Sequence, residues 1–233
     1  AGADAPPRVL VSASAVGYYG NRGEERLTEE SAPGGGFLAG LCREWEAATA
    51  PAVQCGVRVV IVRIGVVLGP GGGPLAKMLL PFRLGLGGPL GNGRQWMSWI
   101  ALDDLVGAVA LAVSREDLSG PINAVAPDQA RSADFARALG KVLGRPAFLP
   151  APAWGLRLLF GELADEALLS SARVVPAKLA AAGFDFRFPR LEGALRHAER
   201  QATTHQFVYQ RVELVPVQGQ HDGVRDHRPM MPL

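Results

Sequence analysis

Two apolar segments limit the fold of this chain more than any other feature of its sequence. RVLVSAS (8–14) is a continuous apolar run that ends in polar residues, and VRVVIVRIGVVLG (57–69) is β-branched and apolar on both faces. Strands of this second kind are typical of parallel sheets, in which helices cover both faces. The sequence therefore predicts two buried strands at the centre of an α/β domain.

The segments around these strands alternate between helical and extended patterns. Apolar residues recur with helical spacing in 36–56, 75–88, 102–113 and 132–144, and short strand patterns occupy 95–100 and 121–127. Such alternation predicts a largely parallel sheet. The expected organisation is a sheet domain over 1–146, a small mainly helical domain over 147–198, and a disordered tail over 199–233. The histidines of that tail are expected to be solvated loop residues.

The charge balance and the cysteines exclude several classes of function. Lys and Arg exceed Asp and Glu by only 24 to 22, which gives no indication of a nucleic-acid partner. No apolar run approaches the ~18 residues of a membrane-spanning helix, and the first residues do not resemble a signal peptide. The two cysteines, Cys42 and Cys55, have neither disulfide-framework nor metal-site spacing. We therefore expect a cytoplasmic protein with reduced cysteines, no bound metal and no membrane partner.

No glycine fingerprint for a dinucleotide follows the first strand. The runs Gly34–Gly36 and Gly71–Gly73 have neither the G-x-G-x-x-G spacing nor the strand-to-helix setting. Two interpretations stay open: the protein binds no dinucleotide, or the segment that would hold its diphosphate is missing. The sheet implied by residues 8–127 is small for strands this apolar, and the chain lacks an initial methionine. Both observations favour a missing amino-terminal part.

Four blocks of the sequence resemble one family. They are VSASAVGYYG, FLAGLCREWEAA, VRVVIVRIGVVLGPGGG and KMLLPFRLGLGGPLGNGRQWMSWIALDDLV. Together they resemble the epimerase-like (YfcH-type) branch of the extended short-chain dehydrogenase/reductases, and the resemblance covers roughly residues 8–198. It implies a Rossmann-like domain that binds NADP or NAD, here without its first βαβ units, and a small helical carboxyl-terminal domain.

The resemblance also implies a catalytic edge. In this family a strand-end serine hydrogen-bonds the reacting oxygen of the substrate. With a one-residue insertion Ser14 matches that position, and Ser12 is the second candidate. A Tyr-x-x-x-Lys relay normally follows on the next helix, but here those positions hold Phe37 and Leu41, which have no acid–base chemistry. Tyr18 or Tyr19 could replace the missing tyrosine. Alternatively, both aromatic rings pack over the cofactor site.

Further candidate site residues follow from the same resemblance. Arg63 ends a buried strand and either contacts ligand or pairs with Glu44, Glu46 or Asp103. The residues expected to contact the cofactor are Ser12, Ala13, Arg63, Leu68, Gly69, Pro70 and Gly71. Those expected to contact the substrate are Lys77, Arg94, Gln95 and Trp99, and the alternatives of an exposed helical lysine for Lys77 and a solvated turn for Arg94 stay open.

Three hypotheses about function remain at this point. The first is an NAD(P)-dependent oxidoreductase or epimerase that acts on a small carbonyl or sugar-nucleotide-like substrate. The second is a non-catalytic nucleotide-binding or regulatory protein, which the absence of the Tyr-x-x-x-Lys relay favours. The third is a truncated product with no function of its own. The sequence predicts no oligomeric state.

Overall fold

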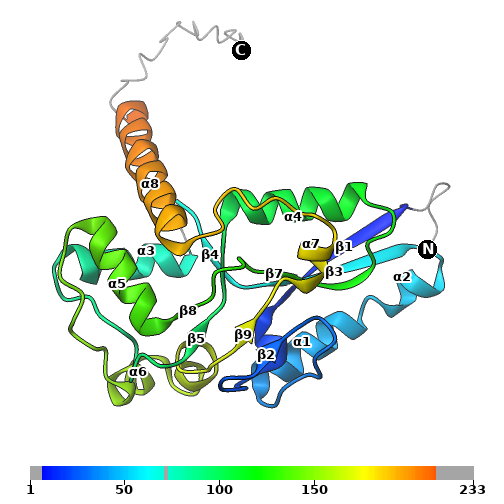
Figure 1. Cartoon of the computed structure of the whole chain (residues 1–233), viewed down its shortest axis with the longest axis horizontal. Helices are drawn as coiled ribbons and strands as arrows, with labels where there is room; N and C mark the ends of the chain where they lie inside the picture. The colour runs from blue at the N-terminus through cyan, green and yellow to red at the C-terminus, as the bar shows by residue number, and fades with distance from the viewer. Residues whose placement is uncertain (1–6, 71–72, 214–233) are drawn as a thin grey trace, which may run out of the picture.

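The two apolar segments lie next to each other in a three-stranded parallel sheet. The structure is a computed structural model that describes residues 7–70 and 73–213 (Figure 1). Its central sheet has the strand order β1 (Val9–Ala15), β3 (Arg58–Ile64), β7 (Gly120–Ala124). Both pairings are parallel. This sheet confirms the α/β class with a parallel sheet.

Helices cover both faces of the central sheet. Helix α4 (Leu102–Ser114) lies on one side, and α1 (Phe37–Ala47) and α2 (Ala50–Gln54) lie on the other (Figure 1). On the α4 side, buried residues of the strands and helices form one apolar cluster, made up of Val60, Val62, Ile100, Ala108, Ala112, Ile122, Ala124 and Leu179. The covered faces explain why these strands are apolar throughout.

The second apolar segment forms two strands rather than the single strand expected. After β3 the chain turns at Gly65, and β4 (Val66–Leu68) pairs with β6 (Trp99–Ala101) instead of continuing in the central sheet. A Cβ atom at Gly65 would lie 2.6 Å from the carbonyl oxygen of Ser98, so only glycine fits there. The apolar pattern runs through this turn because β4 is also packed in a core.

A second group of elements packs beside the central sheet. Its helices are α3 (Gly73–Arg83), α5 (Ser132–Leu143) and α8 (Leu191–Glu213), and its short antiparallel strands are β5 (Trp96–Met97) and β8 (Ala130–Arg131). Pro81 lies inside α3, which continues for two more residues. The core of this group includes Phe82, Trp99, Phe135 and Leu195.

The carboxyl-terminal part is mainly helical, as expected, but it does not stand apart. It contains α6 (Ala153–Phe160), the π-helical turn η2 (Ala164–Leu168), β9 (Arg173–Val174) and α7 (Ala177–Ala181). Strand β9 pairs with β2 (Arg26–Leu27), which follows the 3-10 helix η1 (Val16–Tyr19). The carboxyl-terminal part is therefore paired, through β9 and β2, with the segment that follows the first strand.

The expected boundary of the tail at residue 199 is wrong. Helix α8 runs without interruption from Leu191 to Glu213, so residues 199–213 are helical. Two of the tail histidines, His221 and His227, lie outside the described residues. No helix in the described ranges is both long enough and apolar enough to cross a bilayer.

Candidate functional site

Three polar side chains occupy one row across the central sheet. Ser14 of β1 is in register with Arg63 of β3, which is in register with Asn123 of β7. All three lie near the carboxyl ends of their strands. Ligands of open parallel sheets bind at this edge, so the row marks the candidate site.

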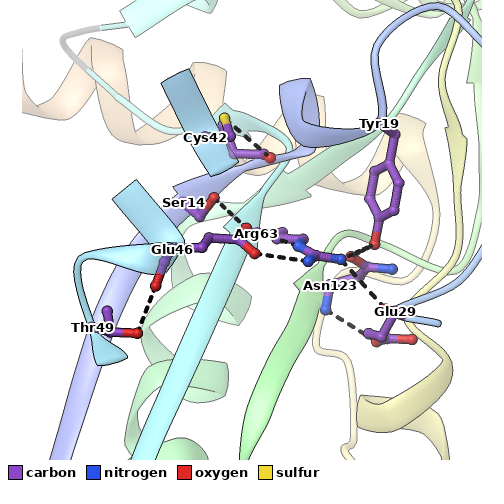
Figure 2. A network of polar contacts seen from close by, with 9 residues as sticks. Ser14, Tyr19, Glu29, Cys42, Glu46, Thr49, Arg63 and Asn123 are labelled. Carbon is purple, nitrogen blue, oxygen red and sulfur yellow. Dashed lines mark hydrogen bonds and ion pairs between the residues drawn. The ribbon is translucent and has the colours of Figure 1, made fainter. Parts of the chain in front are cut away.

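Arg63 is held by Glu46, which projects from α1. The guanidinium Nε and Nη2 atoms donate to the two carboxylate oxygens at 2.9 and 2.8 Å, and Arg63 is only 3% exposed (Figure 2). Burial opposes the charged form, but hydrogen bonds to Glu46 and Tyr19 outweigh it and raise the pKa of Arg63. Of the partners considered from sequence, Glu46 is the one that the structure shows.

Tyr19 belongs to the same network and is held there by two hydrogen bonds. Its hydroxyl donates to Asn123 Oδ1 at 2.7 Å and accepts from Arg63 Nη1 at 3.0 Å, and the whole residue is inaccessible to solvent. Burial raises the pKa of Tyr19, and the nearby Arg63 opposes this only in part. A buried phenol with a raised pKa and two fixed partners is a structural group, which argues against the catalytic role considered for Tyr19.

Tyr18 differs from its neighbour in both partners and exposure. The guanidinium carbon of Arg63 lies 3.5 Å from the centroid of the Tyr18 ring, a cation–π contact that fixes the ring. The rings of Tyr18 and Tyr19 meet edge to face at 5.3 Å. Tyr18 is only partly buried, and no described residue forms a hydrogen bond with its hydroxyl. Its hydroxyl is therefore the one that the network leaves available.

Ser14 forms a hydrogen bond with the same glutamate, Glu46. Its hydroxyl donates to Glu46 Oε1 at 2.8 Å, and the residue is almost fully buried (Figure 2). Glu46 thus holds both Ser14 and Arg63. The contact between Ser14 and a substrate oxygen stays a prediction, and in this structure the hydroxyl proton of Ser14 points to Glu46.

Glu29 joins the network by accepting hydrogen bonds from backbone N–H groups, and it was not expected from the sequence. Its Oε1 accepts the backbone N–H groups of Asn123 at 3.0 Å and Lys178 at 3.1 Å. Its Oε2 is buried and has no hydrogen-bond partner among the described residues. The only signal for Asn123 in the sequence was a polar residue inside the apolar strand pattern PINAVAP, and Glu29 had no comparable signal.

The helix that would carry the family's proton relay is open to solvent at the relevant positions. Phe37 is 72% exposed and Leu41 is 37% exposed. The first backbone N–H groups of α1, those of Phe37 and Leu38, donate to the two carboxylate oxygens of Glu166 at 2.8 and 2.6 Å. A residue of the carboxyl-terminal part therefore caps this helix.

The residues expected to contact the cofactor are only partly brought together. Ser12 is half-buried and Ala13 is exposed on β1, beside the polar row. Leu68 ends β4, away from the central sheet, and its side chain is buried in a core. Gly69 and Pro70 follow it and are half-buried, whereas Gly71 lies outside the described residues. Their contact with a cofactor stays a prediction.

Two of the residues expected to contact the substrate are buried. Trp99 is 1% exposed and belongs to the core, and its contact with a substrate stays a prediction. Gln95 is buried and donates to the carbonyl oxygens of Leu90 and Leu168. Arg94 is exposed, and nothing is described of the Lys77 side chain, so both stay predictions. In the described ranges no group of three or more His, Cys, Asp or Glu side chains could hold a metal ion.

Comparisons with known proteins agree with this geometry. The profile of the NAD dependent epimerase/dehydratase family matches residues 1–124, and that of a domain of unknown function (DUF1731) matches residues 151–198. An epimerase family protein of Mycobacterium tuberculosis is 48% identical over 196 residues, which are 84% of this chain and 65% of the relative. The chain thus spans 65% of the length of these mycobacterial relatives.

Solved structures show the same relationship. Human epimerase family protein SDR39U1, crystallised with NADPH, superposes with a TM-score of 0.79 at 39% identity, over 85% of this chain and 68% of that one. A nucleoside-diphosphate sugar epimerase of Corynebacterium glutamicum gives a TM-score of 0.65 at 35% identity, over 88% and 46% of the two chains. The fold, the polar edge and these matches lead to one conclusion: the chain belongs to the NAD-dependent epimerase/dehydratase family, within the extended short-chain dehydrogenase/reductases.

Proposed function

We propose that the protein is an NAD(P)-dependent oxidoreductase or epimerase that acts on a small carbonyl or sugar-nucleotide-like substrate. Membership of the family supports the nucleotide, and the NADPH of the human neighbour supports NADP over NAD. The observation that supports the proposal most directly is the position of the Tyr18 hydroxyl. This hydroxyl, which has no hydrogen-bond partner among the described residues, lies at the carboxyl edge of the sheet, beside a fixed positive charge.

The described residues fit the nicotinamide end of the cofactor. The half-buried Ser12 and the exposed Ala13 offer a strand edge next to the polar row, and the half-buried Gly69 and Pro70 follow β4. When bound, the nicotinamide supplies or accepts a hydride. The chain shows no glycine fingerprint for the diphosphate, so these residues would hold only the reacting end.

The residues of this chain would transfer a proton to or from the substrate and hold the side chains of the site in position. Tyr18 would exchange a proton with the substrate oxygen while Arg63 fixes its ring. Glu46 would hold Arg63 and Ser14 in place from α1. Tyr19 and Asn123 would keep the strand edge rigid through their mutual hydrogen bond.

A second candidate function is nucleotide binding without catalysis. It is favoured by α1, where exposed Phe37 and Leu41 occupy the positions of the relay. A substitution test separates the two candidates. If the protein is non-catalytic because the relay is absent, the double variant Phe37→Tyr, Leu41→Lys should gain a turnover that the parent lacks.

The test of the main proposal uses a chimaera, because the chain spans only part of its relatives. In human SDR39U1, the segment that matches this chain is replaced by residues 7–198, and NADPH binding is titrated by fluorescence. We expect an affinity similar to that of the human protein, and loss of binding would contradict the proposal. NADPH oxidation is then screened with small carbonyl compounds, and epimerisation with UDP-sugars.

The same chimaera tests the role of Tyr18. Tyr18→Phe should lower turnover by about 10²–10⁴-fold, the usual contribution of a positioned acid–base group, and leave NADPH affinity unchanged. Full turnover in this variant would exclude Tyr18 as the proton donor. Turnover in neither parent nor variant, together with NADPH binding, would favour the non-catalytic candidate.

We also propose a reducing compartment such as the cytoplasm and a small-molecule substrate rather than a nucleic acid. Both cysteines are free, Cys42 buried and Cys55 exposed, and the net charge is only +2. An Arabidopsis relative is named as chloroplastic. Thiol titration of the freshly purified protein tests the state of the cysteines.

A further inference from the structure

Four short strands place three arginines and a tryptophan side by side, away from the polar row. In the antiparallel pair of β5 and β8, Trp96 is opposite Arg131. In the parallel pair of β2 and β9, Arg26 is opposite Arg173. The two pairs are joined because the N–H of Ala172 donates to the carbonyl oxygen of Trp96. Figure 1 shows β8, β5, β9 and β2 in this order.

These four side chains face outward. Alternate residues of a strand point to opposite faces. Met97 and Ala130, the next residues of β5 and β8, pack against the core that contains Trp99 and Phe135. Leu27 and Val174, the next residues of β2 and β9, are fully buried. The arginines and Trp96 therefore share the opposite, solvent-facing side.

The cluster is ordered by contacts around Trp96. The guanidinium carbons of Arg131 and Arg173 each lie 4.6 Å from the indole ring. The indole Nε1 donates to Glu24 Oε2 at 2.9 Å, and Arg131 Nη2 donates to the same oxygen at 2.8 Å. Arg173 donates through Nε to the neutral side chain of Gln129 at 3.0 Å. Two arginine forks are thus oriented around one aromatic ring.

The charges of this cluster do not balance. Arg131 and Arg173 lie close enough to the Glu24 carboxylate to lower its pKa, and Arg26 is in register with Arg173 on the neighbouring strand, so the three arginines exceed this single carboxylate by two charges. Within the described part of the chain, neither Arg26 nor Arg173 forms a salt bridge with a carboxylate, and Arg131 has the one with Glu24. The hydrogen bond from Trp96 and the neighbouring Arg131 and Arg173 lower the pKa of Glu24, which shows that the surroundings already favour an anion there.

We propose that Arg26, Arg131, Arg173 and Trp96 form a binding site for the phosphate group of a small molecule, with Glu24 as a tethered anion that the ligand displaces. Guanidinium forks recognise phosphate by paired hydrogen bonds, and a dianion matches the excess charge. The site shares no residue with the candidate nicotinamide site, so it goes beyond the proposed function. A nucleic acid would need a longer basic surface than four side chains and a net charge of +2 provide.

The test observes Trp96 directly in the full 233-residue chain. The four tryptophan indoles are labelled with ¹⁵N, and the Trp96 signal is assigned with Trp96→Phe. Inorganic phosphate and diphosphate are titrated at constant ionic strength, with chloride as the replaced anion. We expect a saturable shift of the Trp96 signal, with diphosphate binding more tightly than phosphate. No shift, or the same shift with chloride alone, would overturn the proposal.

Matched variants separate a built site from general charge attraction. Arg173→Gln should weaken diphosphate binding by about tenfold, the effect of losing one charge-assisted hydrogen bond. Arg43→Gln removes an exposed arginine of α1 and should leave binding unchanged. Glu24→Gln should strengthen binding because the competing carboxylate is gone. Equal weakening by Arg173→Gln and Arg43→Gln, or weaker binding in Glu24→Gln, would contradict the proposed site.

Discussion

Two arginine–glutamate pairs of this protein have the same chemistry but very different surroundings. The Arg63–Glu46 pair is buried, with side-chain exposures of 4% and 11%, whereas the Arg131–Glu24 pair is open, with exposures of 33% and 66%. Breaking a buried pair leaves an uncompensated charge in the interior, but an open pair can exchange its partner for water or a ligand. The comparison separates a group that fixes the fold from one that is free to bind.

The largest expected effect tests the buried pair. Arg63→Met leaves the carboxylate of Glu46 buried and unpaired, so it should lower the free energy of unfolding by about 3–5 kcal/mol. Urea denaturation measures this. The control is the double variant Arg63→Met, Glu46→Leu, which removes both charges and should recover part of the loss. A single variant as stable as the parent would show that the pair is not structural.

The next effect compares the two neighbouring tyrosines. Tyr19→Phe leaves Asn123 Oδ1 buried without its donor, so it should cost about 1–3 kcal/mol. Tyr18→Phe removes a hydroxyl with no partner among the described residues and should change stability by less than about 0.5 kcal/mol. Thermal melts of the two variants measure the difference. Equal losses would contradict the distinct roles given to these residues.

The raised pKa of Tyr19 predicts a specific pH dependence. Because the ordinary value is 10.0, the unfolded chain releases this proton before the folded chain does as the pH rises. The contribution of Tyr19 to stability is therefore complete below pH 10 and is lost as the pH rises through the folded pKa. The difference in unfolding free energy between the parent and Tyr19→Phe should shrink above pH 10. A difference that grows with pH would reverse the sign of the argument.

A smaller effect tests the contact between the carboxyl-terminal part and α1. Glu166→Gln keeps the shape of the side chain but removes the charge that faces the first N–H groups of the helix, which should cost about 0.5–1 kcal/mol. Hydrogen exchange at Phe37 and Leu38 should accelerate. Unchanged exchange at both amides would show that Glu166 does not hold the helix end.

The smallest effect is expected at the open pair. Glu24→Gln should change the melting temperature less than any variant above, because the Glu24 carboxylate is largely solvated and Arg131 is partly so. The change should shrink further as salt is added, since salt screens exposed charges more than buried ones. A loss as large as that of Arg63→Met, insensitive to salt, would remove the contrast between the two pairs.

The sequence predicted the architecture better than its details. The parallel sheet followed from the apolar segments, because strands covered on both faces leave a clear pattern. The turn at Gly65 did not, since β4 is buried as well and the pattern continues through it. The continuation of α8 past residue 199 was also missed, because the apolar period fails there although the helix does not end.

The site residues that the sequence predicted are those that stand out inside or directly after an apolar strand pattern. Ser14, Tyr18 and Tyr19 stand together in one short stretch, and Arg63 stood out as a charge in an apolar strand. Glu29 and Asn123 come from distant segments that only the folded chain brings together. Glu46 was predicted only as one of three possible partners of Arg63, and the structure shows that it is the one. Trp99 is buried in a core cluster, and an aromatic residue near a polar loop looks the same in sequence whether it faces a ligand or the core.

The most direct measurement of the functional account locates the nicotinamide. In the NADPH-bound chimaera, nuclear Overhauser effects are recorded between the hydrogens at nicotinamide C4 and the ring hydrogens of Tyr18. The account predicts a cross-peak with Tyr18, because its partly exposed ring lies at the carboxyl edge of the sheet. NADPH that binds with no contact to Tyr18, Ser12 or Ala13 would contradict it and would place the reacting end of the cofactor elsewhere.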